Sequence, residues 1–267
     1  MSSRGRRVTV SLLSLRRGQW ARVAVCVLAS LVATLCMGAY GTQTALYEFM
    51  GGGFLVPNPL GGGPSIVAFV AWLAPQAAFC YFFSGVLSDG LGADASAVLP
   101  RVGSRRAWLA GKLAHLAFFS AVFTLLGELA SGMALLVLGC GADASELLDV
   151  VVRCAALGFP LMLCLVLTIN CLALMIDPVV AFAAVVGVYA AGVLTLAYFP
   201  RETAVTAAPW LPFVQGILGW HDCSRWTSAF SLGVPGFPVG VSLAYLGACA
   251  ALAAAWALRL VRVRDIF

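Results

Sequence analysis

Six apolar runs, each about 20 residues long, constrain the fold of this chain more than any other feature. A helix of about 20 residues spans the hydrocarbon core of a bilayer, and none of these runs carries Lys or Arg in its interior. The runs do not alternate apolar and polar residues, which excludes a transmembrane barrel. We therefore predict an all-α integral membrane protein with six transmembrane helices. The spans are expected at about 23–41, 66–87, 113–138, 154–176, 179–199 and 239–258.

The composition agrees with a lipid environment. Hydrophobic residues make up 62% of the 267 residues and charged residues only 10%, whereas a soluble domain carries about 25% charged residues. An ordinary water-soluble enzyme is excluded. We divide the chain into a cytoplasmic amphipathic segment, residues 1–22, and a six-span domain, residues 23–267, which leaves no room for a further soluble domain.

The basic residues predict the orientation of the chain. If both termini are cytoplasmic, thirteen of the sixteen Lys and Arg residues lie inside and three outside. Basic residues near short loops favour the cytoplasmic side, so N-in, C-in is the expected topology. In so apolar a chain this bias indicates membrane orientation, and we expect no nucleic-acid partner.

Two connecting segments have distinctive patterns. In residues 4–20, Val8, Leu12 and Leu15 have helical spacing, which predicts an interfacial amphipathic helix; an unstructured basic tail is the alternative. The loop Pro200–Pro238 is rich in aromatic residues, which predicts a re-entrant hairpin before the last span. A surface loop anchored by tryptophan is the alternative.

Polar residues inside the spans are the candidate functional residues. Gln76, Glu128 and Asn170 lie within predicted spans two, three and four. A lone carboxylate at this depth is costly unless it is protonated or paired, and no span offers a cation. These residues either line a polar substrate pathway or form hydrogen bonds between helices, with Glu128 protonated and structural.

Signs of enzyme chemistry are few. The two histidines, His115 and His221, are far apart in the sequence, and no HExxH, GxSxG or GxGxxG motif occurs. We predict no catalytic residues, no cofactor and no metal. Cys140 and Cys223 are both expected outside, where a disulfide between them is one possibility and two free thiols the other.

The loop after the second span is the most informative connection. Leu91, Ala95, Val98 and Leu99 recur at helix-like spacing before Pro100, which predicts a short amphipathic helix. An exposed apolar face of this kind needs a partner that covers it.

A basic cluster follows this helix and leads into the third span. It contains Arg101, Arg105 and Arg106, and Ser104 is placed to cap the next helix. Trp108 and Lys112 lie four residues apart on one helical face. With Trp20, they are predicted to anchor the chain at the membrane interface.

The segment Leu99-Pro-Arg-Val-Gly-Ser-Arg-Arg-Ala-Trp-Leu-Ala-Gly-Lys112 resembles the inner loop of permease subunits of type-2 ABC exporters from Gram-positive bacteria. The ending Arg262-Val-Arg-Asp-Ile-Phe267 is similar to their basic tails. The architecture also resembles theirs, although the Pro200–Pro238 loop is long and the glycine-rich loop at 51–63 is not diagnostic of any subgroup.

This resemblance implies a transport subunit rather than an enzyme. In that family the segment before the arginines docks on a separate ATPase subunit, a role we carry over to about Leu91–Arg106. The expected partners are this ATPase, a second permease copy or a related permease, and membrane lipid, in a bacterial plasma membrane. An amphipathic peptide, a lipid-linked compound or a drug is the expected cargo. A secondary carrier that uses Glu128 and an intramembrane enzyme are the alternatives.

Overall fold

The computed structural model describes residues 17–38, 49–57, 64–92, 105–139, 144–222, 234 and 236–263. Within these ranges the regular structure is entirely helical. Six of the described helices are long and apolar enough to cross a membrane, which confirms the predicted all-α fold with six candidate spans. The chain is therefore treated as a multi-pass membrane protein.

The six long helices are α2, α4, α7, α8, α9 and α11. They cover Arg17–Gly38, Ile66–Phe82, Arg105–Val137, Ala144–Ala173, Pro178–Tyr198 and Val239–Val263. Two short α-helices, α5 and α10, cover Val86–Gly92 and Arg201–Ala207. Three single turns of 3-10 helix, η1, η2 and η3, cover Gly53–Leu55, Ala208–Trp210 and Leu218–Trp220.

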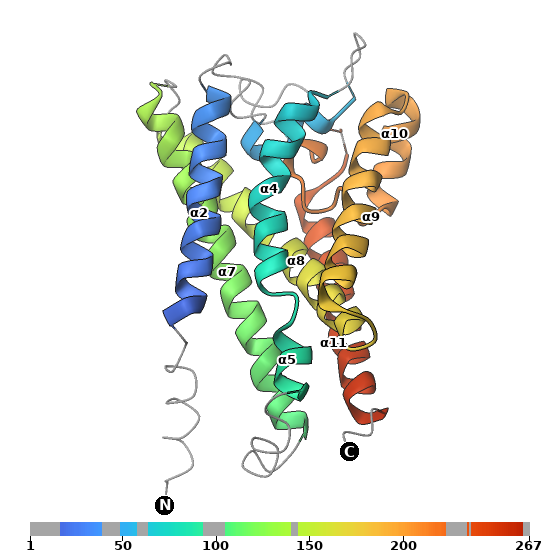
Figure 1. Ribbon diagram of the computed structural model, residues 1–267. Coiled ribbons are helices and arrows are strands. Elements are labelled where there is room, and N and C mark those ends of the chain that lie inside the picture. Colours follow the sequence, from blue (N-terminus) through green and yellow to red (C-terminus); the bar gives the residue numbers. More distant parts are fainter. Residues whose placement is uncertain are drawn as a thin grey trace, which may run out of the picture.

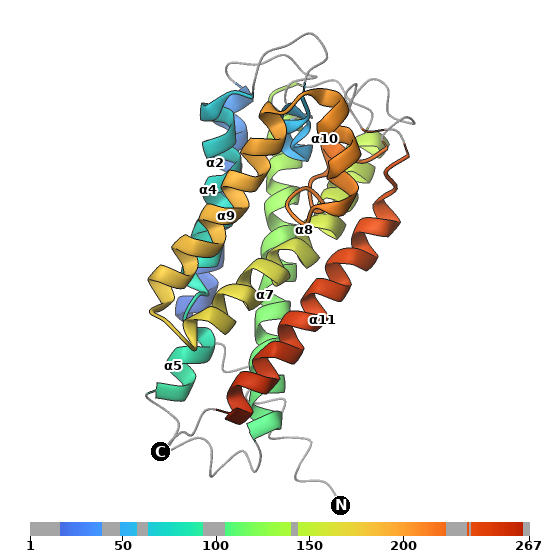
Figure 2. The ribbon, with the colours of Figure 1, turned by 90° about the vertical axis from the view of Figure 1, so that its right-hand side faces the viewer.

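The long helices form one bundle with distinct ends (Figure 1). Helix α2 begins at the lower end, where α11 ends and α5 lies, whereas α10 lies at the upper end. Helix α8 crosses the bundle and contacts α7, α9 and α11, while α2 packs against α4 and α7. Figure 2 shows α11 alongside α8, with α10 and the turns after it at the upper end.

Several helix bounds differ from the predicted spans. Helix α7 begins at Arg105 rather than at residue 113, and α8 begins at Ala144 rather than at residue 154. The apolar run marks only the part of a helix that needs lipid, whereas backbone hydrogen bonding continues through the polar residues before it. Helix α2 runs unbroken from Arg17 into the first span, so no helix break marks the predicted boundary at residue 22.

The second predicted span is interrupted. Helix α4 ends at Phe82, residues 83–85 form a turn, and α5 begins at Val86. The span predicted at 66–87 is found as the candidate span Ile66–Asp89, but it is not one continuous helix. Helix α5 ends at Gly92, and residues 93–104 lie outside the described part, so the short helix predicted from Leu91 to Leu99 stays a prediction.

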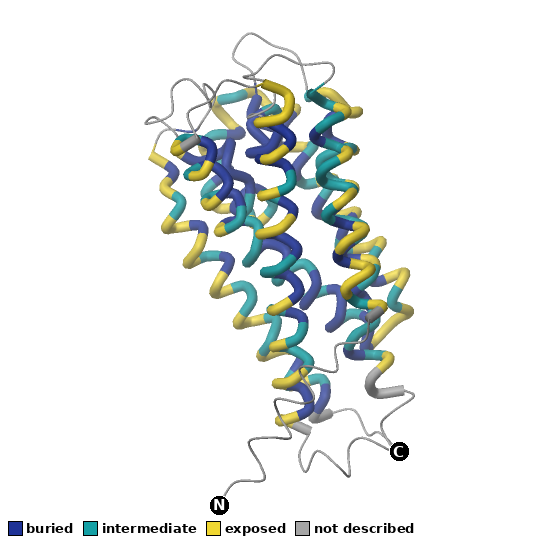
Figure 3. The backbone as a smooth tube through the Cα atoms, turned by 90° about the vertical axis from the view of Figure 1, so that its left-hand side faces the viewer, coloured by how far each residue is buried: buried dark blue, intermediate teal, exposed yellow. Residues whose placement is uncertain are grey.

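The burial pattern is that of a bundle surrounded by an apolar medium (Figure 3). Large apolar side chains are exposed on the outer helix faces, for example Val67, Val137 and Leu252 at 73%, 77% and 71%. Inside, Phe79 of α4 stacks on Phe123 of α7 with ring centroids 4.6 Å apart. Such outward exposure destabilises a protein in water but is the expected surface in lipid.

Local capping explains where some spans begin. Asp177 precedes α9 and its carboxylate accepts hydrogen bonds from the amides of Val179 and Val180, at 2.8 and 3.3 Å. Pro178, which has no amide proton to satisfy, is the first helical residue. Together these features fix the start of α9.

The chain between α9 and α11 is packed into the bundle. After α10, the segment from Val214 to His221 is largely buried, and Trp220 and His221 are completely buried. Gly219 lies directly against the backbone of Gly53 in η1, where no side chain would fit. This close approach joins the two connections at the upper end of the bundle.

Candidate functional site

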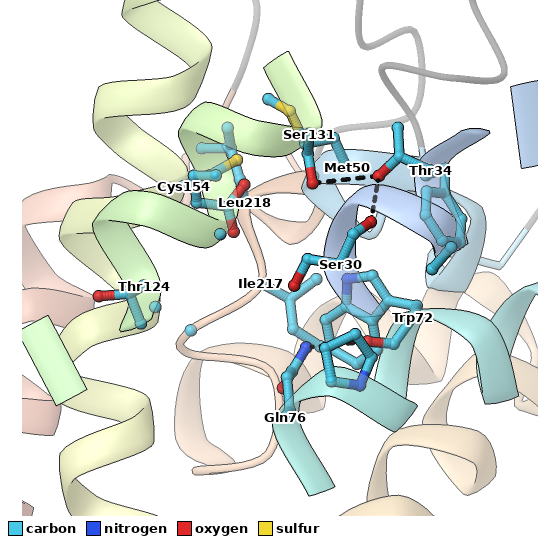
Figure 4. Close-up of a pocket in the computed structure, with 18 of the residues that line it drawn as sticks. Ser30, Thr34, Met50, Trp72, Gln76, Thr124, Ser131, Cys154, Ile217 and Leu218 are labelled. Carbon is cyan, nitrogen blue, oxygen red and sulfur yellow. Dashed lines mark hydrogen bonds between the residues drawn. The ribbon is translucent and has the colours of Figure 1, made fainter. Parts of the chain in front are cut away.

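A cavity of about 80 Å³ lies between α2, α4, α7 and α8. Residues 49–51 and 216–218, from the connections at the upper end, also line it (Figure 4). A polar cavity of more than about 15 Å³ can hold a water molecule, so this one has room for several waters or a small ligand group. Its polar lining consists of Ser30, Thr34, Gln76, Thr124, Glu128 and Ser131.

Two of the three candidate residues from the sequence meet in this cavity. Gln76 lines it from α4 and Glu128 from α7. Glu128 is the only charged residue among the described lining residues, and its side chain makes no hydrogen bond or ion pair with another described residue. The Gln76 amide donates weakly to the carbonyl of Trp72 at 3.4 Å, while its buried Oε1 has no partner among the described residues.

The hydroxyl groups of the lining are already engaged. Thr34 Oγ1 donates to the carbonyl of Ser30 at 3.0 Å, and the hydroxyls of Thr34 and Ser131 are hydrogen-bonded at 3.0 Å. Ser30 and Thr124 donate to the carbonyls of Cys26 and Ser120, at 3.2 and 2.9 Å. In Figure 4, Trp72 and Gln76 lie on one side of the cavity and Thr124 on the other.

The structure places Asn170, the third candidate, away from this cavity. Its amide donates to the carbonyls of Phe83 and Val166 at 2.8 and 2.9 Å. Its Oδ1 accepts from the amide of Leu87 at 2.9 Å. Phe83 is the C-cap of α4 and Leu87 lies in the first turn of α5, so one side chain caps both sides of the break.

The predicted interface anchors have different surroundings. Trp20 is 41% exposed and packs edge-on against Phe119, with ring centroids 5.4 Å apart. Trp108 is only 6% exposed, and its ring packs in a buried apolar cluster of the bundle, so its role at the membrane interface stays a prediction. Lys112 lies over the Trp108 ring, with Nζ 5.8 Å from the centroid, which confirms that the two share a helical face.

Most of the predicted coupling loop is outside the described residues. The parts that the structure does not describe are Val98, Leu99, Arg101 and Ser104, as well as the side chains of Leu91 and Arg105. Helix α7 begins at Arg105, directly after the predicted cap at Ser104, and Arg106 is exposed. Residues 1–16, Cys140 and Cys223 also lie outside the described part, so the amphipathic helix and the disulfide stay predictions.

A second polar cluster, not predicted from the sequence, joins the end of η3 to α11. His221 Nδ1 lies 2.9 Å from the carbonyl of Ile217, and Nε2 lies 2.8 Å from Ser242 Oγ. The Ser242 hydroxyl donates its one proton to Gln215 Oε1 at 2.6 Å, and Gln215 donates to the carbonyl of Pro209 at 2.8 Å.

This cluster is built for structure rather than binding. Gln215, His221 and Ser242 are all 0% exposed. Burial lowers the pKa of His221 to about 4, because an imidazolium ion there is poorly solvated. The only sequence signal was a histidine inside an aromatic loop, which says nothing about its partners.

No protein-family model, curated protein or solved structure matches this chain. The resemblance to exporter permeases therefore rests on the inner-loop residues and on the order of the segments.

Proposed function

We propose that the chain is the membrane subunit of an ATP-binding-cassette exporter in a bacterial plasma membrane, driven by a separate ATPase subunit. Both termini and the loop after α5 are cytoplasmic in this proposal, as the distribution of basic residues favours. The N-terminal end of α2 and the C-terminal end of α11 lie at the same end of the bundle as α5 (Figure 1). A second permease copy or a related permease completes the transporter.

The observation that carries the proposal is the attachment of α5 to the bundle. A coupling element must transmit movement at the cytoplasmic surface to the spans. Asn170 hydrogen-bonds both Phe83 and Leu87, so displacement of α5 pulls directly on α8. Helix α8 in turn packs against α7, α9 and α11 and lines the polar cavity. A rigid connection of this kind suits a two-state transporter.

Connections at the upper end of the bundle contribute to the cavity lining. Met50 and Gly51 line it from the connection after α2, and Ile217 and Leu218 line it from the connection after α9. We assign the segment between α9 and α11 to a re-entrant hairpin in the outer leaflet, because its buried backbone is covered by protein as irregular backbone in lipid must be.

The test is a pair of substitutions in the predicted coupling helix. Leu91→Asp and Val98→Asp are expected to abolish substrate-stimulated ATPase activity and to weaken co-purification of the ATPase, while insertion in the membrane is normal. Ala97→Asp is the matched control, since helical spacing places residue 97 on the opposite face. An intact complex with full activity in both variants would remove the support for an ABC transporter.

A secondary carrier is the second candidate, because the cavity contains Glu128 without an ionic partner among the described residues. Transport by such a carrier depends on an ion gradient and needs no ATPase. Uptake or efflux in proteoliposomes that contain this chain alone distinguishes the two functions.

A further inference from the structure

The chemistry of the cavity lining selects its ligand. The hydroxyl protons of Ser30, Thr34 and Thr124 are all donated to backbone carbonyls of their own helices. The hydroxyls of Thr34 and Ser131 are also hydrogen-bonded to each other, at 3.0 Å. These hydroxyl groups are therefore already engaged with the backbone or with one another, and each keeps an oxygen lone pair that can accept a hydrogen bond.

The lining atoms that lack a hydrogen-bond partner among the described residues are also oxygens. Gln76 donates through its nitrogen, and its buried Oε1 has no partner among the described residues. The carboxyl of Glu128 likewise lacks a hydrogen-bonded partner there. A buried acceptor without a donor costs about 1–3 kcal/mol, and an unpaired buried carboxylate costs more. The ligand that removes both costs is a hydrogen-bond donor with a positive charge.

Aromatic and apolar groups complete the lining. Trp72, Phe49 and Phe123 border the same cavity, and aromatic rings attract cations that lie within about 6 Å of the ring centroid. Leu161 and Ile217 offer apolar contact to carbon atoms. At about 80 Å³ the cavity admits a small head group and its first carbons.

We infer that this cavity binds the primary ammonium group of an amphiphilic amine, with the Glu128 carboxylate as counter-ion and Gln76 Oε1 as acceptor. An ammonium group has three N–H donors and no acceptor, which matches a lining of unused oxygens. A quaternary ammonium has the charge but no donors, and an alcohol has a donor but no charge. The inference names the substrate class of the proposed exporter and in that sense rests on the proposed function.

The experiment measures binding to the chain alone, without an ATPase. Titration calorimetry with hexylammonium is carried out on the full chain in nanodiscs of phosphatidylcholine, and the heat from empty nanodiscs is subtracted. We expect saturable binding of one hexylammonium per chain, with at least tenfold weaker binding of hexanol and several-fold weaker binding of hexyltrimethylammonium. Equal binding of hexanol, or no saturable binding of hexylammonium, would overturn the inference.

Variants assign the binding to the cavity. Glu128→Gln is expected to weaken hexylammonium binding at least tenfold and Gln76→Leu about fivefold. Glu202→Gln, which removes an exposed carboxylate on α10, is the control and should bind as the wild type does. Thermal unfolding of each variant shows whether it is folded, and Gln76→Leu still tests the site if Glu128→Gln fails to fold.

The outcomes separate this site from the proposed function. Unchanged binding in both folded cavity variants overturns the ammonium site, whatever the ATPase experiments show. The opposite result is also informative. If binding depends on Glu128 while the Leu91→Asp and Val98→Asp variants keep full ATPase coupling, the ammonium site is supported. Only the exporter assignment is then contradicted.

Discussion

Two polar regions inside this bundle differ in how far their hydrogen bonds are satisfied. Asn170, at the α4–α5 break, uses its amide nitrogen and its oxygen on three backbone partners. In the cavity, Gln76 Oε1 and the Glu128 carboxyl are unpartnered among the described residues. A satisfied polar group stabilises the fold that holds it, whereas an unsatisfied group costs stability and persists where a ligand uses it.

The largest expected effect follows from removal of the satisfied group. Asn170→Leu leaves the carbonyl of Phe83 and the amide of Leu87 without their side-chain partner in a buried place. We expect a loss of about 3 kcal/mol of unfolding free energy, measured by denaturant or thermal unfolding in detergent. Ser88→Ala on α5 is the control, because that hydroxyl donates only locally, to the carbonyl of Gly85, and its loss should cost less than about 0.5 kcal/mol.

A second test concerns the close backbone approach of η3 to η1 at the upper end of the bundle. Gly219→Ala would force a methyl group onto the backbone of Gly53, which cannot move as a side-chain end can. Overpacking of this kind costs about 2 kcal/mol. Gly247→Ala on α11 is the matched control, since a methyl there meets no atom within 4 Å. Equal unfolding temperatures for the two variants would show that η1 and η3 are not pressed together.

The sequence predicts the number and type of spans because lipid leaves few options for a long apolar run. It does not predict the break at residues 83–85, since Ser84 and Gly85 occur within an otherwise continuous apolar run. The reason for the break lies on α8, in Asn170, about 85 residues further along the chain. A contact at that separation leaves no local pattern.

The candidate site was predicted in part for a related reason. Gln76 and Glu128 stand out because amides and carboxyls are costly in lipid. Ser30 and Thr34 do not, because hydroxyls in transmembrane helices commonly bond the carbonyl four residues earlier, as both do here. Only the packing of α2 against α7 reveals that Thr34 lies beside Ser131.

Removal of a hydrogen bond from the His221 cluster should also lower the unfolding free energy, but by less than the Asn170 substitution does. Ser242→Ala removes the hydroxyl that joins His221 to Gln215, and we expect a loss of about 1.5 kcal/mol by thermal unfolding at neutral pH. Thr206→Ala on α10 is the control, because its hydroxyl is exposed and donates only to the carbonyl of Glu202 in the same helix. If both variants unfold at the same temperature, the buried cluster adds nothing to stability beyond what a surface hydroxyl does.

The pH dependence of stability gives a second test of this cluster. The pKa of His221 is lowered by burial from its ordinary value near 6.5 to about 4. The neutral ring therefore contributes stability that is complete above pH 6.5 and is lost as the pH falls from 6.5 to about 4. His221→Gln should remove this part of the pH dependence, so the stability difference between wild type and variant should shrink on acidification. A difference that is constant from about pH 7 to about pH 4 would contradict a buried neutral histidine.

The smallest expected effect falls on the residue with the most prominent chemistry. Glu128→Gln keeps the size and shape of the side chain, and the carboxyl that it replaces has no hydrogen bond to lose among the described residues. The unfolding free energy should change by less than about 0.5 kcal/mol, or rise, because an amide is less costly to bury than an unpaired carboxyl. Thermal unfolding in detergent without any amine measures this, with Asn170→Leu as the reference for a satisfied group. A loss as large as that of Asn170→Leu would mean that Glu128 holds the bundle together, and the contrast between the two polar regions would disappear.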